Sequence, residues 1–180
     1  FDGKRISIAG YHYIVLHKPA SYVCKTKDTE FTSIVELINS RTEDRTYYFA
    51  NSLGPEQTGL VLFTDDARWA NRMRKKLSKK TCVYMVNMKS VISEDQFRQI
   101  KKASVAASDS QIGATIGVQR QDERSLLLLL NQVRLQEILD ILCSMELAIQ
   151  TIRLQKLGLF SLGDLKEGHY LELYENEIKV

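Results

Sequence analysis

The sequence predicts an α+β domain built around a mixed, mostly antiparallel sheet. Short apolar or β-branched runs are interspersed with amphipathic segments of helical period, and their order follows no regular strand-helix-strand alternation. No internal repeat is present. At 180 residues the chain is long enough to bury a substantial core, as one domain or as one domain of two lobes.

Strands are expected where apolar, aromatic and β-branched residues cluster between turn residues. These segments are 11–19, 59–64, 82–88, 126–130 and 147–155. The first is closed by Pro19, and the five consecutive leucines of the fourth predict a buried strand. Residues 157–178 alternate short strands with glycine turns, so the chain is expected to end in small antiparallel connections.

Three helices are expected, each with a recognisable signal. Residues 65–77 begin with Asp65 and Asp66, which are expected to cap a helix that ends in basic residues. Residues 93–103 carry the Ser93 and Gln96 pair of a capping box, and residues 133–145 space their apolar side chains on one helical face. The small and polar segment 104–117 predicts a loop, or a hinge between two lobes.

Composition excludes several classes of protein. The longest apolar run has five residues, well short of a membrane helix. Cys24, Cys82 and Cys143 are far apart and odd in number, which argues against a zinc site or a disulfide framework and favours a reducing compartment. The chain has no phosphate loop, no G-x-G-x-x-G and no H-E-x-x-H, so kinases, dinucleotide enzymes and zinc proteases are excluded and no metal site is expected.

Positive charge is concentrated in one segment, although the net charge is only +3. The cations that cluster there are Arg68, Arg72, Arg74, Lys75, Lys76, Lys79 and Lys80. Two interpretations are open from the residues alone: a solvated helix face, or a surface that contacts the phosphates of RNA.

Four segments match one pattern in the same order. They are "HKPASYVC" against H-K-P-x-x-Y-V-C, "LGPEQTGLVLFTDDARWANRM" against R-L-D-x-D-T-x-G-L-V-L-x-T-D-D-G-x-W-x-x-R, "CVYMV" against K-x-Y-L-V, and "LGLFSLGDLKEGHYLELYENEI" against I-G-x-x-x-L-x-D-L-x-P-G-E-Y-R-x-L-T-x-E-E-I. Together they resemble the bacterial small-subunit rRNA pseudouridine synthases across almost the whole chain.

The resemblance implies a fold and a reaction. Residues 1–180 are expected to form a pseudouridine synthase-like catalytic domain, with a sheet in two lobes, flanking helices and a central cleft. Because residues 1–3 resemble the start of that domain, the family's small amino-terminal RNA-binding module is expected to be absent from this chain. The implied reaction turns uridine into pseudouridine without a cofactor, after the base has left its stack.

The same alignment shows that the reactive residues have changed. The family's aspartate, which attacks the nucleotide or relays a proton, falls on Gly54, and the preceding arginine falls on Ser52. The lysine of K-x-Y is Cys82. Tyr84 is retained where the family packs an aromatic ring against the target base, although a tyrosine in a buried strand is also an ordinary core residue. Glu56 is the nearest carboxylate that could substitute.

A further block, E-G-R-x-x-Q-[VI]-[KR]-R-M, aligns with "QVRLQEILDI". Arg134 is retained there, the glutamine becomes Glu137, and the two basic residues become Leu139 and Asp140. Loss of the carboxylate together with its basic surroundings predicts an impaired or inactive catalytic site.

Contacts with RNA are expected from the residues that the resemblance places around the site. They are His17, Lys18, Arg68, Trp69, Arg72, Arg74, Lys75, Lys76, Lys79, Lys80 and Arg134. Simple exposure at the end of a strand is the alternative for His17 and Lys18.

Three functions follow as hypotheses. The first is a catalytically silent protein that binds rRNA or a pre-ribosomal particle, with other assembly or ribosomal proteins as partners. The second is an active rRNA isomerase that uses Glu56, and the third is a fold that now serves protein contacts only. The resemblance implies no membrane partner, and it places the chain in the cytoplasm or in an organelle matrix such as the mitochondrion.

Overall fold

The chain forms two compact units in the computed structural model, which describes residues 10–26, 28–38, 45–108, 117–131, 134–173 and 178. The first unit comprises residues 1–77 and 162–180, and the second comprises residues 78–161. The chain therefore crosses between them after Leu77 and again after Ser161. The pairings between the long strands within each unit are antiparallel, as the sequence predicts.

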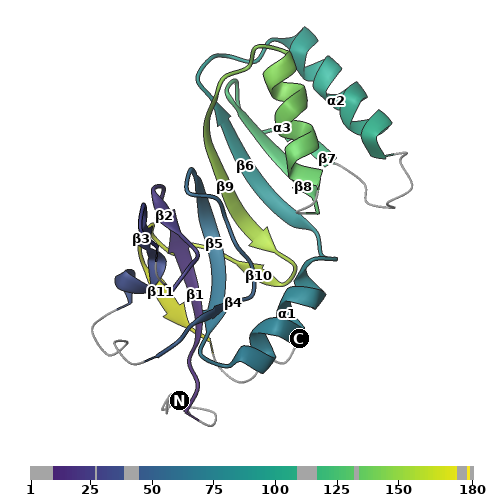
Figure 1. Ribbon diagram of the computed structural model, residues 1–180. Helices are drawn as coiled ribbons and strands as arrows, with labels where there is room; N and C mark the ends of the chain where they lie inside the picture. Colours follow the sequence, from purple (N-terminus) through teal and green to yellow (C-terminus); the bar gives the residue numbers. More distant parts are fainter. Residues whose placement is uncertain are drawn as a thin grey trace. The chain divides into compact units, whose positions relative to one another are not determined.

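The first unit contains a small antiparallel sheet (Figure 1). Its central strand β1 pairs with β11 on one side and with β5 on the other, and β4 pairs with the end of β5. The bounds are β1 Tyr13–Lys18, β4 Tyr48–Phe49, β5 Gln57–Thr64 and β11 Tyr170–Glu172. Beside this sheet, β2 (Tyr22–Val23) and β3 (Thr32–Ser33) form a short parallel ladder, followed by the 3₁₀ turn η1 (Ile34–Leu37).

The helix α1 (Ala67–Leu77) begins directly after β5 because Asp66 caps it. The Asp66 carboxylate accepts the backbone N–H groups of Arg68 at 2.9 Å and Trp69 at 3.0 Å. Asp65 has another role: its carboxylate accepts the His12 N–H at 2.7 Å and pairs with Arg45. The predicted cap is thus confirmed for Asp66 and wrong for Asp65.

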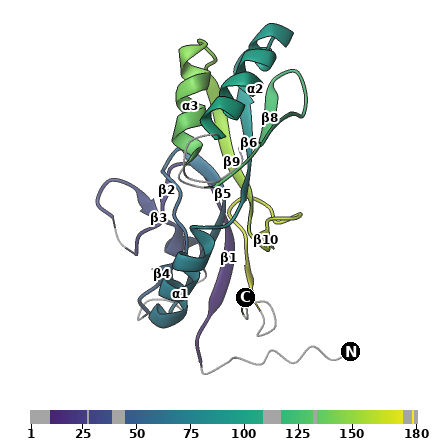
Figure 2. The same cartoon turned by 90° about the vertical axis from the view of Figure 1, so that its right-hand side faces the viewer.

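The second unit contains a four-stranded antiparallel ladder in the order β9, β6, β8, β7, with β10 hairpinned onto β9. The strands are β6 Cys82–Met88, β7 Gly117–Arg120, β8 Ser125–Leu130, β9 Ile149–Leu157 and β10 Phe160–Ser161. The helices α2 (Glu94–Ser108) and α3 (Leu135–Ser144) pack against each other, as Figures 1 and 2 show.

Alternation of side chains along β6 and β8 sets the core of the second unit. Every second residue of β6 from Cys82 to Met88 is buried, and the residues between them are half-buried. The leucine run behaves in the same way: Leu127 and Leu129 are half-buried, whereas the other three are buried. A run of five leucines therefore does not make a strand that is buried on both faces.

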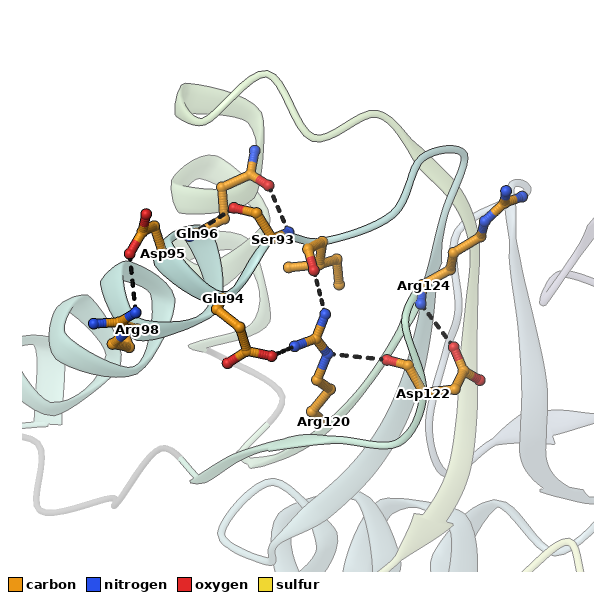
Figure 3. Close-up of polar contacts among 9 residues, drawn as sticks. Ser93, Glu94, Asp95, Gln96, Arg98, Arg120, Asp122 and Arg124 are labelled. Carbon is orange, nitrogen blue, oxygen red and sulfur yellow. Dashed lines mark hydrogen bonds and ion pairs between the residues drawn. The ribbon is translucent and has the colours of Figure 1, made fainter.

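An arginine ties the start of α2 to the β7–β8 hairpin (Figure 3). The guanidinium of Arg120 pairs with the Glu94 carboxylate and donates to the backbone carbonyls of Ile92 and Asp122. The predicted capping box closes the same end of the helix: the Ser93 N–H donates to Gln96 Oε1 at 2.9 Å, and the Gln96 N–H donates to Ser93 Oγ at 3.1 Å.

The loop or hinge predicted over 104–117 needs correction. Residues 104–108 continue α2, because this stretch contains alanines, which favour helix, and Ser104 is buried with its hydroxyl donating to the Lys101 carbonyl. Residues 109–116 lie outside the described residues, and Gly117 begins β7. The described parts of the segment, residues 104–108 and Gly117, lie in the second unit, and the two units divide after Leu77 and after Ser161.

Candidate functional site

The candidate site is a β-turn from Gly54 to Gln57 that leads into β5. The Gly54 carbonyl accepts the Gln57 N–H at 3.1 Å, and the Gly54 N–H donates to Gln57 Oε1 at 3.1 Å. Pro55 occupies the second position of the turn, where its fixed φ is favourable. The Gln57 side chain was not predicted as part of the site, although its spacing of three residues from the glycine is the signal that could have found it.

The backbone of Gly54 does not require glycine. The positive-φ glycines of the described residues are Gly10, Gly59, Gly158, Gly163 and Gly168. Gly54 is outside that group, so an L-residue could adopt its conformation. Gly59, with φ of +121°, shows the contrast, because only glycine tolerates that conformation well.

Glu56 lies against the place where a side chain on residue 54 would begin. Its Oε1 atom is 3.3 Å from the position of a β-carbon on residue 54. The Glu56 side chain is exposed and flexible, so it could move aside for a larger residue. The turn thus lacks the carboxylate at residue 54 but presents one from residue 56 in the adjoining space.

Lys18 anchors this turn through hydrogen bonds to its backbone carbonyls. It is fully buried, and its ammonium donates to the carbonyls of Pro19 at 2.9 Å, Pro55 at 3.3 Å and Gln57 at 2.7 Å. Burial lowers the pKa of Lys18, while the negative charge of Glu56 acts in the opposite direction. Neither predicted role, RNA contact or simple exposure, fits a lysine whose three donors are engaged by backbone carbonyls.

Cys24 fixes the segment just before the turn. Its Sγ atom accepts the Leu53 N–H at 3.5 Å, and the thiol donates to the Leu53 carbonyl at 3.8 Å. Burial raises the pKa of the Cys24 thiol, which keeps it protonated and unreactive. Asn51 adds a second anchor, because its amide exchanges hydrogen bonds with Leu60 and Leu62 of β5.

His17 also differs from the prediction, because it is buried rather than exposed. Its Nδ1 lies 2.8 Å from the Leu165 carbonyl, and its backbone groups pair with Gly168 and His169. The burial follows from its position on the central strand β1, where neighbours cover both faces.

Tyr84 and Arg134 lie in the second unit, and both are buried. Tyr84 is 1% exposed and stands opposite Leu128 and Leu154, which agrees with the alternative of a core tyrosine. The Arg134 guanidinium donates to Glu137 Oε2 from Nε at 3.2 Å and from Nη2 at 2.9 Å. A buried arginine held by the carboxylate of the next helical turn is not presented to a phosphate, contrary to the RNA contact expected of it.

The cations predicted for a basic surface on α1 are exposed, whereas Trp69, predicted to contact RNA with them, is buried. Trp69 is 5% exposed: its ring meets Tyr13 edge to face with centroids 5.1 Å apart, and its indole N–H donates to the Ile178 carbonyl at 3.2 Å. It is a core residue because it lies on the buried side of the helix. The exposed cations are Arg68, Arg72, Arg74, Lys75 and Lys76 on α1, and Lys79 and Lys80 just after it in the second unit.

Two further observations concern what the described residues lack. None of the helices in that part of the chain is long and apolar enough to cross a membrane. Across the same residues, no three His, Cys, Asp or Glu side chains gather as the ligands of a metal ion would.

The family model described as "RNA pseudouridylate synthase" matches residues 12–137. The chain belongs to this family. Among named relatives, the ribosomal small subunit pseudouridine synthase A of Vibrio vulnificus is 24% identical over 99% of this chain and 77% of its own length, and the protein of that name from Escherichia coli is 24% identical over 99% and 78%.

A solved structure supports the pseudouridine synthase fold. A crystal structure titled "Crystal structure of pseudouridylate synthase" superposes with a TM-score of 0.71 at 19% identity, covering 97% of this chain and 74% of that one. The predicted α+β fold class of this pseudouridine synthase family member is confirmed.

Proposed function

We propose that this pseudouridine synthase family member binds rRNA, alone or in a pre-ribosomal particle, without isomerising uridine. The observation that carries the proposal is Gly54: the position of the family's carboxylate has no side chain, although the backbone there does not require glycine. The burial of Arg134 against Glu137 points the same way, because it neutralises a retained cation locally.

The exposed cations of α1 support the RNA-binding half of the proposal. The helix carries Arg68, Arg72, Arg74, Lys75 and Lys76 without one acidic residue. Each phosphate that such cations neutralise releases counterions, so binding would weaken steeply with salt. The names of the relatives give rRNA as the RNA to test first. An rRNA partner would place the protein in the cytoplasm or in an organelle matrix such as the mitochondrion.

A binding assay tests this half. We expect the unaltered protein to bind small-subunit rRNA, and the triple variant Arg68→Gln, Arg72→Gln, Lys75→Gln to bind more weakly. The slope of log affinity against log salt should fall by up to about 2 for three phosphate contacts on single-stranded RNA. The matched control removes the same charge from α2, as Arg98→Gln, Lys101→Gln, Lys102→Gln, and should leave the slope unchanged. Absence of binding by the unaltered protein would favour a fold that serves protein contacts only.

A second function has a specific observation in its favour. Because Glu56 Oε1 lies 3.3 Å from the β-carbon position of residue 54, Glu56 could supply the carboxylate of an active isomerase. One fact argues against this second function. The Glu56 side chain starts two residues further along the turn than residue 54, and catalytic geometry tolerates misplacement of about 1 Å poorly.

One experiment separates the two functions. Small-subunit rRNA is incubated with the protein, and pseudouridine is mapped by a chemical adduct that stops primer extension. We expect no product from the unaltered protein. Product that Glu56→Gln abolishes and that the matched variant Glu123→Gln leaves intact would overturn the silent function and establish the second. Gly54→Asp tests whether restoring the carboxylate alone restores turnover.

A further inference from the structure

One exposed aromatic residue of the first unit lies next to the basic helix α1. Tyr48 of β4 is 39% exposed, whereas its neighbours Tyr47 and Phe49 pack their rings against Phe63. Successive side chains of a strand point to opposite faces, so Tyr48 faces away from that aromatic cluster.

The register of the sheet places Tyr48 on the face that α1 covers. Thr64 of β5 stands directly opposite Tyr48 on one side and Tyr13 on the other, so the three side chains share a face. Tyr13 packs against Trp69 of α1. Tyr48 therefore lies on the same side of the sheet as α1.

Arg74 joins the two elements. Its Nη2 donates to the Phe49 carbonyl at 2.6 Å and its Nη1 to Asn71 Oδ1 at 3.2 Å, so the guanidinium reaches from α1 to the strand that carries Tyr48. A guanidinium has five N–H donors, and these two bonds orient the group without using all of them. The exposed Tyr48 ring thus lies on the α1 side of the sheet, and Arg74 is bonded to the residue next to it. Arg72 and Lys75 lie on the exposed side of the helix.

This combination matches the chemistry of single-stranded nucleic acid. Cations bind the phosphates, and an exposed aromatic ring stacks on a base that is not paired in a duplex. We propose that Tyr48 and Arg74 form a stacking site for one unpaired base of the bound RNA, at the β4 side of α1. The inference rests on the proposed RNA-binding function. It adds that the bound RNA is single-stranded at this site and that Tyr48 contacts one of its bases.

The test measures binding of a short unstructured RNA and of a fully paired RNA hairpin by fluorescence anisotropy. Tyr48→Ala should weaken binding of the unpaired RNA by on the order of tenfold, the scale of one base stacked on an aromatic ring. It should leave the salt slope unchanged, because stacking neutralises no phosphate. Binding of the hairpin should not change, since its bases are already stacked.

Two variants act as controls. Tyr48→Phe keeps the ring and should bind as the unaltered protein does. Phe31→Ala removes an aromatic side chain that is also 39% exposed but precedes β3, and it should have no effect. A photoactivatable uridine in the unpaired RNA should crosslink to the peptide that contains Tyr48, which checks the contact without any substitution.

The outcomes distinguish this inference from the function on which it rests. If the unaltered protein binds neither RNA, both are overturned. If it binds but Tyr48→Ala retains full affinity for the unpaired RNA, or loses affinity for the hairpin equally, the stacking site is overturned and RNA binding by α1 stands.

Discussion

The carboxylate of Glu56 and the bare α-carbon of Gly54 are neighbours: Glu56 Oε1 lies 3.3 Å from the place that a β-carbon on residue 54 would take. The glycine is not there to satisfy a left-handed backbone, because its φ lies in the range that L-residues adopt. The backbone of the turn can therefore accept a side chain at residue 54. The end of the Glu56 side chain occupies part of the space that such a side chain would take.

Gly54→Ala should leave the free energy of unfolding unchanged or raise it by up to about 1 kcal/mol, because alanine restricts the unfolded chain and Glu56 can shift by a few tenths of an ångström. Urea denaturation measures the difference. Gly163→Ala is the matched control: a β-carbon there would meet nothing within 4 Å, but its φ of +50° should cost about 1 kcal/mol through backbone strain alone. This account of the turn would be contradicted if Gly54→Ala lowered the free energy of unfolding more than Gly163→Ala does.

Lys18→Met should destabilise the protein by at least about 2 kcal/mol, because three carbonyls lose a charged donor in a buried setting. Hydrogen exchange should speed up at the Ser21 N–H, which donates to the Pro55 carbonyl of the same turn. Lys25→Met is the control: this exposed lysine pairs with Asp28 at the surface, and its loss should destabilise the protein far less than the loss of Lys18. Equal effects of the two variants would show that Lys18 does not anchor the turn.

Tyr13→Phe should change how stability responds to alkaline pH. Burial, followed by the hydrogen bond that the hydroxyl donates to Asp66, raises the pKa of Tyr13 to about 12. A tyrosine that holds its proton more tightly when folded stabilises the protein below pH of about 10, its unfolded pKa, and this contribution is lost as pH rises towards 12. The unaltered protein should therefore lose stability relative to Tyr13→Phe across that window, in denaturation curves recorded at each pH. Tyr11→Phe, at an exposed position, should retain the full alkaline loss.

The sequence predicts the long elements well, because their signals are local. The bounds of β6 follow from its own composition, and the capping box at Ser93 and Gln96 is complete within four residues. The short strands β2, β3, β4 and β7 escaped prediction, since two to four residues carry no period. Their pairing depends on partners that are distant in the chain.

The site was harder to predict because charge is visible in a sequence and burial is not. Lys18, Trp69 and Arg134 all have the residue types of an RNA surface, yet each is buried. For Lys18 two of the partners are carbonyls of residues 55 and 57, more than 35 positions away. Glu56 shows the reverse: its nearness to residue 54 depends on how the turn closes, which composition alone does not specify.

The ion pair between Arg134 and Glu137 should contribute to the stability of the folded protein. The Arg134 side chain is 1% exposed and Glu137 accepts two of its N–H groups, so Glu137→Gln should cost about 1.5 to 3 kcal/mol of stability by removing the charge that balances a buried guanidinium. A double-mutant cycle with Arg134→Met measures the coupling free energy. The control cycle uses Arg98 and Asp95, which have the same spacing of three residues but lie exposed on α2, and it should give at most about 0.5 kcal/mol. A coupling as small for the buried pair as for the exposed one would mean that Glu137 does not compensate Arg134, and the local neutralisation that supports the silent function would be lost.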